Sequence, residues 1–131
     1  MGLIYLDSCI VIYLLEPRAA QHNRVRTLVA AERGRRLCIS PLVKAECLVG
    51  PMRTGDFALQ AAYEVFFSTA QTLDMQEPVF VNAARLRARF NLKMPDALHL
   101  ACAQRHACDA LWTNDTRLNA AAGGLARALT V

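Results

Sequence analysis

The stretch Leu3–Ser8, with the sequence LIYLDS, decides how this chain folds. Its first four residues form an uninterrupted apolar run, which is typical of a buried strand. Asp7 follows at the end of the run, and a second apolar segment, residues 9–15, begins shortly after it. A carboxylate between two buried segments costs free energy unless another group pairs with it. We therefore expect Asp7 to belong to a functional site at the end of this strand.

The composition predicts one globular domain. The chain has 131 residues, 54% of them hydrophobic, and its mean hydropathy is +0.20. This composition excludes a disordered chain, and the length fits a single domain over residues 1–131. We find no apolar run of the roughly 18 residues that a membrane span needs and no signal peptide at the start, so a cytoplasmic location without a membrane partner is expected.

The five cysteines have no metal-site or disulfide pattern. Their number is odd, no CxxC motif occurs, and all have apolar surroundings. This pattern favours free, buried thiols in a reducing compartment over a zinc site or a disulfide framework.

The charge distribution favours a polyanionic partner. The net charge is +4, from 15 basic and 11 acidic residues. If four acids are gathered in one metal site, 15 bases face the remaining 7 acids, a balance of +8. Such an excess is typical of proteins that bind nucleic acid.

Short apolar runs alternate with helical periodicity along the chain, which predicts an α/β fold with a mainly parallel, roughly five-stranded sheet. Strands are expected at residues 3–6, 37–39, 72–75, 110–113 and 126–131. Helices are expected from Ser8, which is placed to cap the first of them, and over residues 19–35, 41–50, 56–70, 77–90 and 95–107. The helix over 95–107 is apolar on most sides and should lie deep in the structure.

Four acids that are far apart in sequence fall on the same edge of this predicted sheet. Asp7 ends the first strand, and Asp115 lies two residues past the fourth. Asp96 lies in the first turn of its helix, and Glu46 lies in the second turn of the helix that follows the second strand. The loops and helix starts that follow parallel strands converge at one edge, where such folds bind ligands.

Four carboxylates in one pocket repel one another by roughly 4 kcal/mol per pair at about 4 Å and an effective dielectric of about 20. A cation relieves this repulsion, and oxygen ligands without His or Cys select Mg²⁺ or Mn²⁺. Such an ion supports hydrolysis of a phosphodiester. Each acid also has an ordinary interpretation: Asp96 and Asp115 as cap or turn residues, and Glu46 as a surface residue with only Lys44 nearby to pair with it.

Four segments resemble the PIN-domain nucleases, and the size of the chain resembles the VapC toxins of toxin–antitoxin pairs. The segments are LDS at residues 6–8, SPLVKAE at 40–46, MPDALHLA at 94–101 and WTND at 112–115.

The resemblance implies a Rossmann-like α/β/α sandwich and an endoribonuclease that depends on Mg²⁺ or Mn²⁺. It also implies inhibition by a cognate VapB-like antitoxin, and a homodimer is expected. Matched position by position, the catalytic and metal-binding quartet would be Asp7, Glu46, Asp96 and Asp115, with Ser8 and Thr113 as supporting hydroxyls. Cys9 departs from the pattern, because many members have a small polar residue there.

Several features stay open at the level of sequence. His99, one turn after Asp96, is either a metal or phosphate contact or a half-buried packing histidine, and packing is the favoured interpretation. Arg85 and Arg89 share one helix face, which is either solvated or in contact with phosphate. The apolar face of the helix over 56–70 either packs in the core, dimerises or receives the antitoxin. A non-catalytic module that binds RNA or protein is the alternative to the nuclease.

Overall fold

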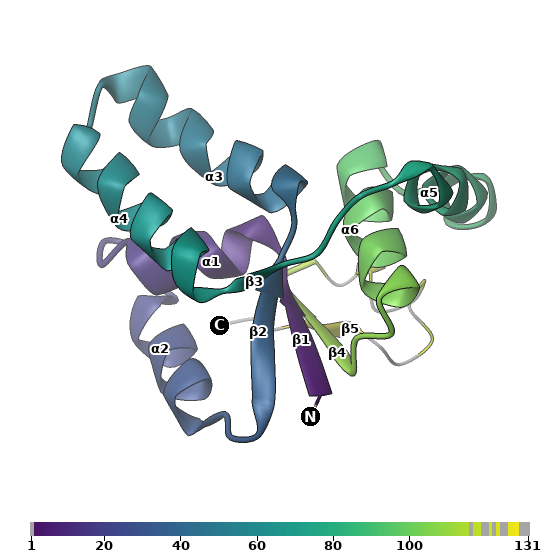
Figure 1. Cartoon of the computed structure of the whole chain (residues 1–131), viewed down its shortest axis with the longest axis horizontal. Helices are drawn as coiled ribbons and strands as arrows, with labels where there is room; N and C mark the ends of the chain where they lie inside the picture. Colours follow the sequence, from purple (N-terminus) through teal and green to yellow (C-terminus); the bar gives the residue numbers. More distant parts are fainter. Residues whose placement is uncertain (1, 116, 119–120, 122, 124–125, 129–131) are drawn as a thin grey trace.

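The computed structural model describes residues 2–115, 117–118, 121, 123 and 126–128 (Figure 1). Its five strands form one parallel sheet in the order β3-β2-β1-β4-β5. The strands are β1 (Gly2–Leu6), β2 (Arg35–Ile39), β3 (Gln71–Thr72), β4 (Ala110–Thr113) and β5 (Ala126–Ala128). The helices are α1 (Ser8–Leu15), α2 (His22–Ala31), α3 (Pro41–Thr54), α4 (Phe57–Thr69), α5 (Glu77–Phe90) and α6 (Met94–Arg105).

The strand order creates a topological switch point beside β1. The chain runs from β1 outward to β2 and β3, and it then returns to place β4 on the other side of β1. Ile4 of β1 is therefore paired with Leu37 of β2 and with Ala110 of β4. In parallel sheets the crevice at such a point, outside the carboxyl ends of the strands, is where ligands bind.

The helices form layers on the two sides of the sheet. Figure 1 shows α1 to α4 on one side of the strands and α5 with α6 on the other. Helix α5 packs along α6, and α1 packs against both α2 and α3. This arrangement confirms the predicted α/β/α sandwich.

The core is built around β1 and α6. Ile4, Tyr5 and Leu6 have no exposed surface, as a strand covered on both faces requires. In α6 every residue from Ala97 to Ala103 is buried, which confirms that this helix lies deep in the fold. Asp7 directly follows the buried strand β1, so it lies at the edge of the sheet next to the core.

Two helix boundaries differ from the sequence prediction for clear reasons. Asp7, not Ser8, caps α1, because its extended backbone lets its carboxylate accept a hydrogen bond from the Ser8 amide. Helix α3 continues through Pro51 to Thr54 instead of ending at Gly50. Pro51 keeps its carbonyl as an acceptor for the amides of Gly55 and Asp56, and Gly55 ends the helix in the left-handed region.

Smaller differences concern α2 and the edge strands. Helix α2 begins at His22 and ends at Ala31, so it is shorter than the predicted 19–35. Strand β3 covers 71–72 in place of 72–75, and its pairing with β2 ends where the Leu73 amide donates to the Ile39 carbonyl. Strand β5 is an edge strand, as predicted, and residues 129–131 of that prediction lie outside the described residues.

The aromatic residues of α4 are not all in the core. Tyr63 and Phe67 are buried, whereas Phe57 is 79% exposed and Val65 is 64% exposed. Of the alternatives for this helix, packing in the core holds for Tyr63 and Phe67 but not for Phe57, which lies in the first turn of α4. The exposed residues leave an apolar face uncovered on this helix.

The cysteines are free, as predicted. Cys9 is half-buried and the other four are buried. Burial raises the pKa of the Cys47 and Cys102 thiols to about 12, which leaves them protonated and unreactive at neutral pH.

Within the described part of the chain, none of the helices combines the length and apolar character required to cross a membrane.

Candidate functional site

The four acids predicted from the sequence line one pocket of about 440 Å³ at the carboxyl edge of the sheet. Asp7 comes from the end of β1, Glu46 from α3, Asp96 from the first turn of α6, and Asp115 from the segment after β4. The pocket thus opens at the switch point between β1 and β4, and each carboxylate is supplied by a different element.

Asp7 is the most buried and most constrained of the four, with 7% exposure. Its Oδ1 accepts a hydrogen bond from the Ser8 amide at 2.7 Å, and the Ser8 hydroxyl lies 3.4 Å away. Its Oδ2 accepts a hydrogen bond from the Thr113 hydroxyl at 2.7 Å. Because Thr113 Oγ1 also accepts from the Asp115 amide at 3.1 Å, one buried hydroxyl joins the ends of β1 and β4. Ser8 and Thr113 therefore both contact Asp7, where the resemblance expects supporting hydroxyls.

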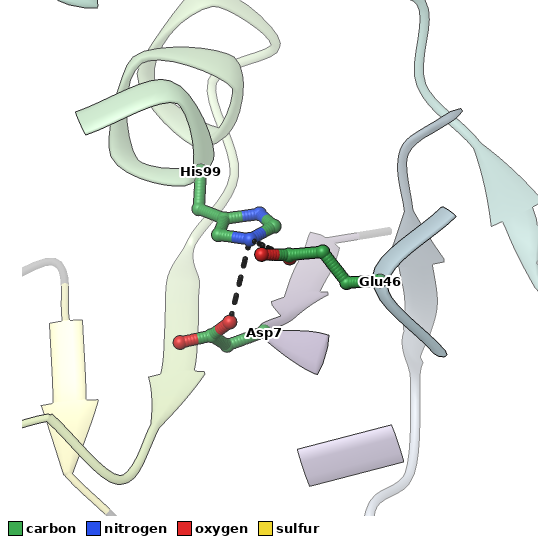
Figure 2. Close-up of side chains that lie close together, drawn as sticks. All are labelled: Asp7, Glu46 and His99. Atoms are coloured by element: carbon green, nitrogen blue, oxygen red, sulfur yellow. Dashed lines mark hydrogen bonds and ion pairs between the residues drawn. The ribbon is translucent and has the colours of Figure 1, made fainter. Parts of the chain in front are cut away.

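Glu46 is held by His99. Figure 2 shows the His99 ring of α6 pointing toward the carboxylates of Glu46 and Asp7. Its Nε2 lies 2.6 Å from Glu46 Oε1 and 3.5 Å from Asp7 Oδ1. Burial acts to raise the pKa of Glu46, but its hydrogen bond with His99 and the charge of His99 more than offset this and hold the pKa below the ordinary value.

Asp96 and Asp115 share one arginine. The Arg117 guanidinium lies 3.1 Å from Asp115 Oδ2 and 4.0 Å from Asp96 Oδ2. Its hydrogen bonds to Asp115 hold the pKa of that carboxyl below its ordinary value. Burial and the negative charges of Asp115 and Asp7 raise the pKa of Asp96. The carboxylates at the mouth of the pocket thus repel one another, and Arg117 relieves only part of this repulsion.

His99 is more central to the site than its sequence context predicts. The apolar helix favours a half-buried packing residue, but His99 is 1% exposed and faces the carboxylates. The partner suggested for Glu46, Lys44, instead lies over the Phe67 ring, 5.9 Å from its centroid. The one available signal was the spacing of His99 three residues after Asp96, which places both side chains on the same face of α6.

Three further residues complete the wall of the pocket: Cys9, Tyr13 and Asn114. Burial and the charge of Asp7 raise the pKa of the Cys9 thiol to about 12, so Cys9 is a neutral residue beside the acids. Asn114 donates a hydrogen bond to the Tyr13 hydroxyl at 3.1 Å. Among the described residues, Asn114 Oδ1 is a buried acceptor without a donor.

The residues of the pocket fit a divalent cation. Asp7, Glu46 and His99 place ligand atoms within 4.8 Å of one another. Carboxylate oxygens suit hard divalent ions, and an imidazole nitrogen suits the first-row transition metals. Burial and the neighbouring charges of Asp115 and Asp7 raise the pKa of Asp96, and a bound cation would favour its charged form.

The His99 contacts predict a pH-dependent stability of the metal-free protein. Burial lowers the pKa of His99, but the hydrogen bond to Glu46 and the charges of Asp7, Glu46 and Asp96 more than offset this and raise it. A raised pKa adds stability below the unfolded-state pKa of about 6.5, and this stability is lost as the pH rises through the folded-state pKa. With a chelator present, urea unfolding should therefore show a lower free energy of unfolding at pH 8 than at pH 6.

The matched control for this prediction is His106, whose contact is with Asp74 outside the pocket. His99→Gln should flatten the decline between pH 6 and 8, whereas His106→Gln should retain it. A wild-type stability that rises across this interval would contradict the assignment.

The fold and the site together define the class of protein: a parallel α/β domain with a carboxylate pocket at the switch point of its sheet. The chain belongs to the PIN domain family, whose model matches residues 4–124. A comparison with curated proteins finds no match.

Solved structures show the same fold. A toxin–antitoxin complex from Klebsiella pneumoniae aligns with a TM-score of 0.80 at 23% identity, over 98% of this chain and 99% of the other. VapBC2 from Rickettsia felis, bound to a fragment of its promoter DNA, aligns with a TM-score of 0.78 at 17% identity, over 96% and 98%. VapC20 from Mycobacterium tuberculosis, a toxin that cleaves the sarcin–ricin loop, aligns with a TM-score of 0.76 at 19% identity, over 90% and 94%.

Proposed function

We propose that this protein is a VapC-like toxin: a metal-dependent endoribonuclease that hydrolyses RNA phosphodiester bonds and is inhibited by a cognate antitoxin. The observation that carries the proposal is the convergence of Asp7, Glu46, Asp96 and Asp115, which come from four separate elements, on one pocket. Family membership and the fold shared with VapC structures support it.

In this proposal Asp7, Glu46, Asp96 and Asp115 hold Mg²⁺ or Mn²⁺. A bound ion would supply an activated water and stabilise negative charge on the scissile phosphate. The residues of the chain prepare the site: Ser8 and Thr113 fix both oxygens of Asp7, and His99 orients Glu46. Asp96 lies in the first turn of α6, where the helix dipole favours an anion.

The substrate proposal rests on charge. With the four pocket acids set aside, 15 bases face 7 acids. Arg85 and Arg89 are both exposed on α5. Arg85 donates a hydrogen bond to Asn82, but the helix face that carries the two arginines is open to solvent. We assign these arginines to backbone contacts with RNA in the cytoplasm.

The partner proposal rests on uncovered apolar surface. Met52 on α3 is 56% exposed, and it adds to the exposed Phe57 and Val65 on α4. Large apolar side chains exposed together mark an interaction site. We assign this surface to the antitoxin or to the second copy of a homodimer. Size-exclusion chromatography of Phe57→Ser distinguishes the two: loss of the dimer without antitoxin indicates the second copy, and loss of the complex with antitoxin indicates the antitoxin.

The test of the activity is cleavage of purified total RNA. With Mn²⁺ or Mg²⁺ the wild-type protein should produce discrete fragments, a chelator should stop cleavage, and excess metal should restore it. Cleavage that continues in the chelator would contradict the metal-dependent mechanism. An intact RNA at every metal concentration would favour the non-catalytic binding module.

A further inference from the structure

The side chain of His99 lies among the proposed metal ligands. Its Nε2 is 2.6 Å from Glu46 Oε1 and 3.5 Å from Asp7 Oδ1 (Figure 2). Ligands of one ion with bonds of about 2.1 Å at right angles lie about 3 Å apart. The two separations from His99 bracket this value, and the ligand atoms of all three groups lie within 4.8 Å of one another, as ligands of a single ion do.

The other nitrogen of His99 is also held by a hydrogen bond, here to a hydroxyl group. Nδ1 lies 2.7 Å from the Tyr5 hydroxyl, and this hydroxyl lies 2.7 Å from Ser40 Oγ. Tyr5, Ser40 and His99 are all buried. Metal-bound histidines nearly always hydrogen-bond through the second ring nitrogen, which fixes the orientation of the ring.

The hydroxyls of Tyr5 and Ser40 can accept the proton arrangement that His99 needs when it binds a metal. When Nε2 binds a cation it carries no proton, so Nδ1 carries the proton and donates it to the Tyr5 oxygen. The Tyr5 hydroxyl then donates to Ser40 Oγ, which also accepts from the Val43 amide. Because hydroxyl groups rotate, the same pair also serves the metal-free form, in which Nε2 donates to Glu46.

We propose that His99 Nε2 is a ligand of the divalent ion together with Asp7 and Glu46, and that this nitrogen makes the site prefer Mn²⁺ to Mg²⁺. The inference rests on the proposed metal site and specifies its chemistry. Mg²⁺ prefers oxygen ligands, whereas imidazole suits first-row transition metals. An all-carboxylate pocket, as the sequence predicted, would lack this preference.

The direct test uses Mn²⁺ alone and requires no substitution. Pulsed electron paramagnetic resonance of the Mn²⁺-loaded wild-type protein should show coupling to a ligated nitrogen. Labelling the three histidines with ¹⁵N should replace the ¹⁴N signal by that of ¹⁵N. Bound Mn²⁺ without a histidine coupling would overturn the proposal and would leave His99 as a residue that only orients Glu46.

Variants identify which histidine is responsible. In His99→Gln the nitrogen coupling should vanish, and the Kd for Mn²⁺ should rise about tenfold or more, with a smaller change for Mg²⁺. Tyr5→Phe removes the hydroxyl that orients the ring and should weaken Mn²⁺ binding in the same direction. The matched control is His22→Gln, whose Nδ1 contacts the Tyr13 carbonyl, and it should retain both the coupling and the affinity.

The outcomes separate this inference from the proposed function. A wild-type protein that binds neither Mn²⁺ nor Mg²⁺ in calorimetry overturns both. A protein that binds both ions equally, with the same ratio in His99→Gln, overturns only the role of His99.

Discussion

Asp7→Asn should reduce the rate of RNA cleavage by about a thousandfold, equal to about 4 kcal/mol of activation free energy. The substitution keeps the shape of the side chain and one oxygen that accepts from the Ser8 amide. The new amide group faces Thr113 Oγ1, which is able to accept a hydrogen bond in place of donating one. The fold should therefore be retained while the negative charge closest to the core is lost. The measurement is the initial cleavage rate in Mn²⁺.

The matched control is Asp74→Asn, because Asp74 is an exposed carboxylate that does not line the pocket. This variant should cleave RNA at the wild-type rate, and circular dichroism should show equal folding for all three proteins. If Asp7→Asn cleaved as fast as the wild type, the carboxylate pocket would not be the active site.

Mn²⁺ should stabilise the folded protein strongly. At a concentration one hundred times its Kd, a ligand that binds only the folded state adds about 2.7 kcal/mol to the free energy of unfolding. For a domain of this size the increase corresponds to a rise in Tm of roughly 10 °C. The physical reason is that a cation offsets both the burial of Asp96 and its repulsion from Asp115 and Asp7, which together raise the pKa of Asp96. Differential scanning calorimetry with and without Mn²⁺ measures the effect.

The specificity of the thermal shift is tested with the same pair of variants. Asp74→Asn should show the full shift, and Asp7→Asn should lose most of it. An equal shift in both variants would place the ion elsewhere on the protein, and no shift in the wild type would argue for a binding module without a metal site.

The positions of the carboxylates were predictable because they depend on backbone topology. Asp7 and Asp115 lie just after the ends of β1 and β4, and parallel strands place those ends at one edge of the sheet. Asp96 follows from the start of α6, which Pro95 signals in the sequence. The position of each of these carboxylates depends on a few residues around the end of a strand or the start of a helix, and these residues can be recognised in the sequence.

The partners of the carboxylates were not predictable to the same degree, because they depend on side-chain packing between distant elements. Glu46 pairs with His99, 53 residues away, and not with its sequence neighbour Lys44. A histidine between leucines on an apolar helix gives the same pattern whether it packs against carbon or faces an acid. Only the packing of α6 against β1, which brings the ring to Tyr5, distinguishes the two.

The carboxylates of the pocket are spread along the sequence from Asp7 to Asp115, and this has a consequence for the synthesis of the protein. The end of β4 supplies both Asp115 and the Thr113 hydroxyl that holds Asp7. A chain still being synthesised contains Asp7 as soon as β1 has been made, but it lacks this clamp until β4 has been translated. The proposed RNA-cleaving centre therefore stays incomplete during synthesis, and it forms only when β4 has paired with β1.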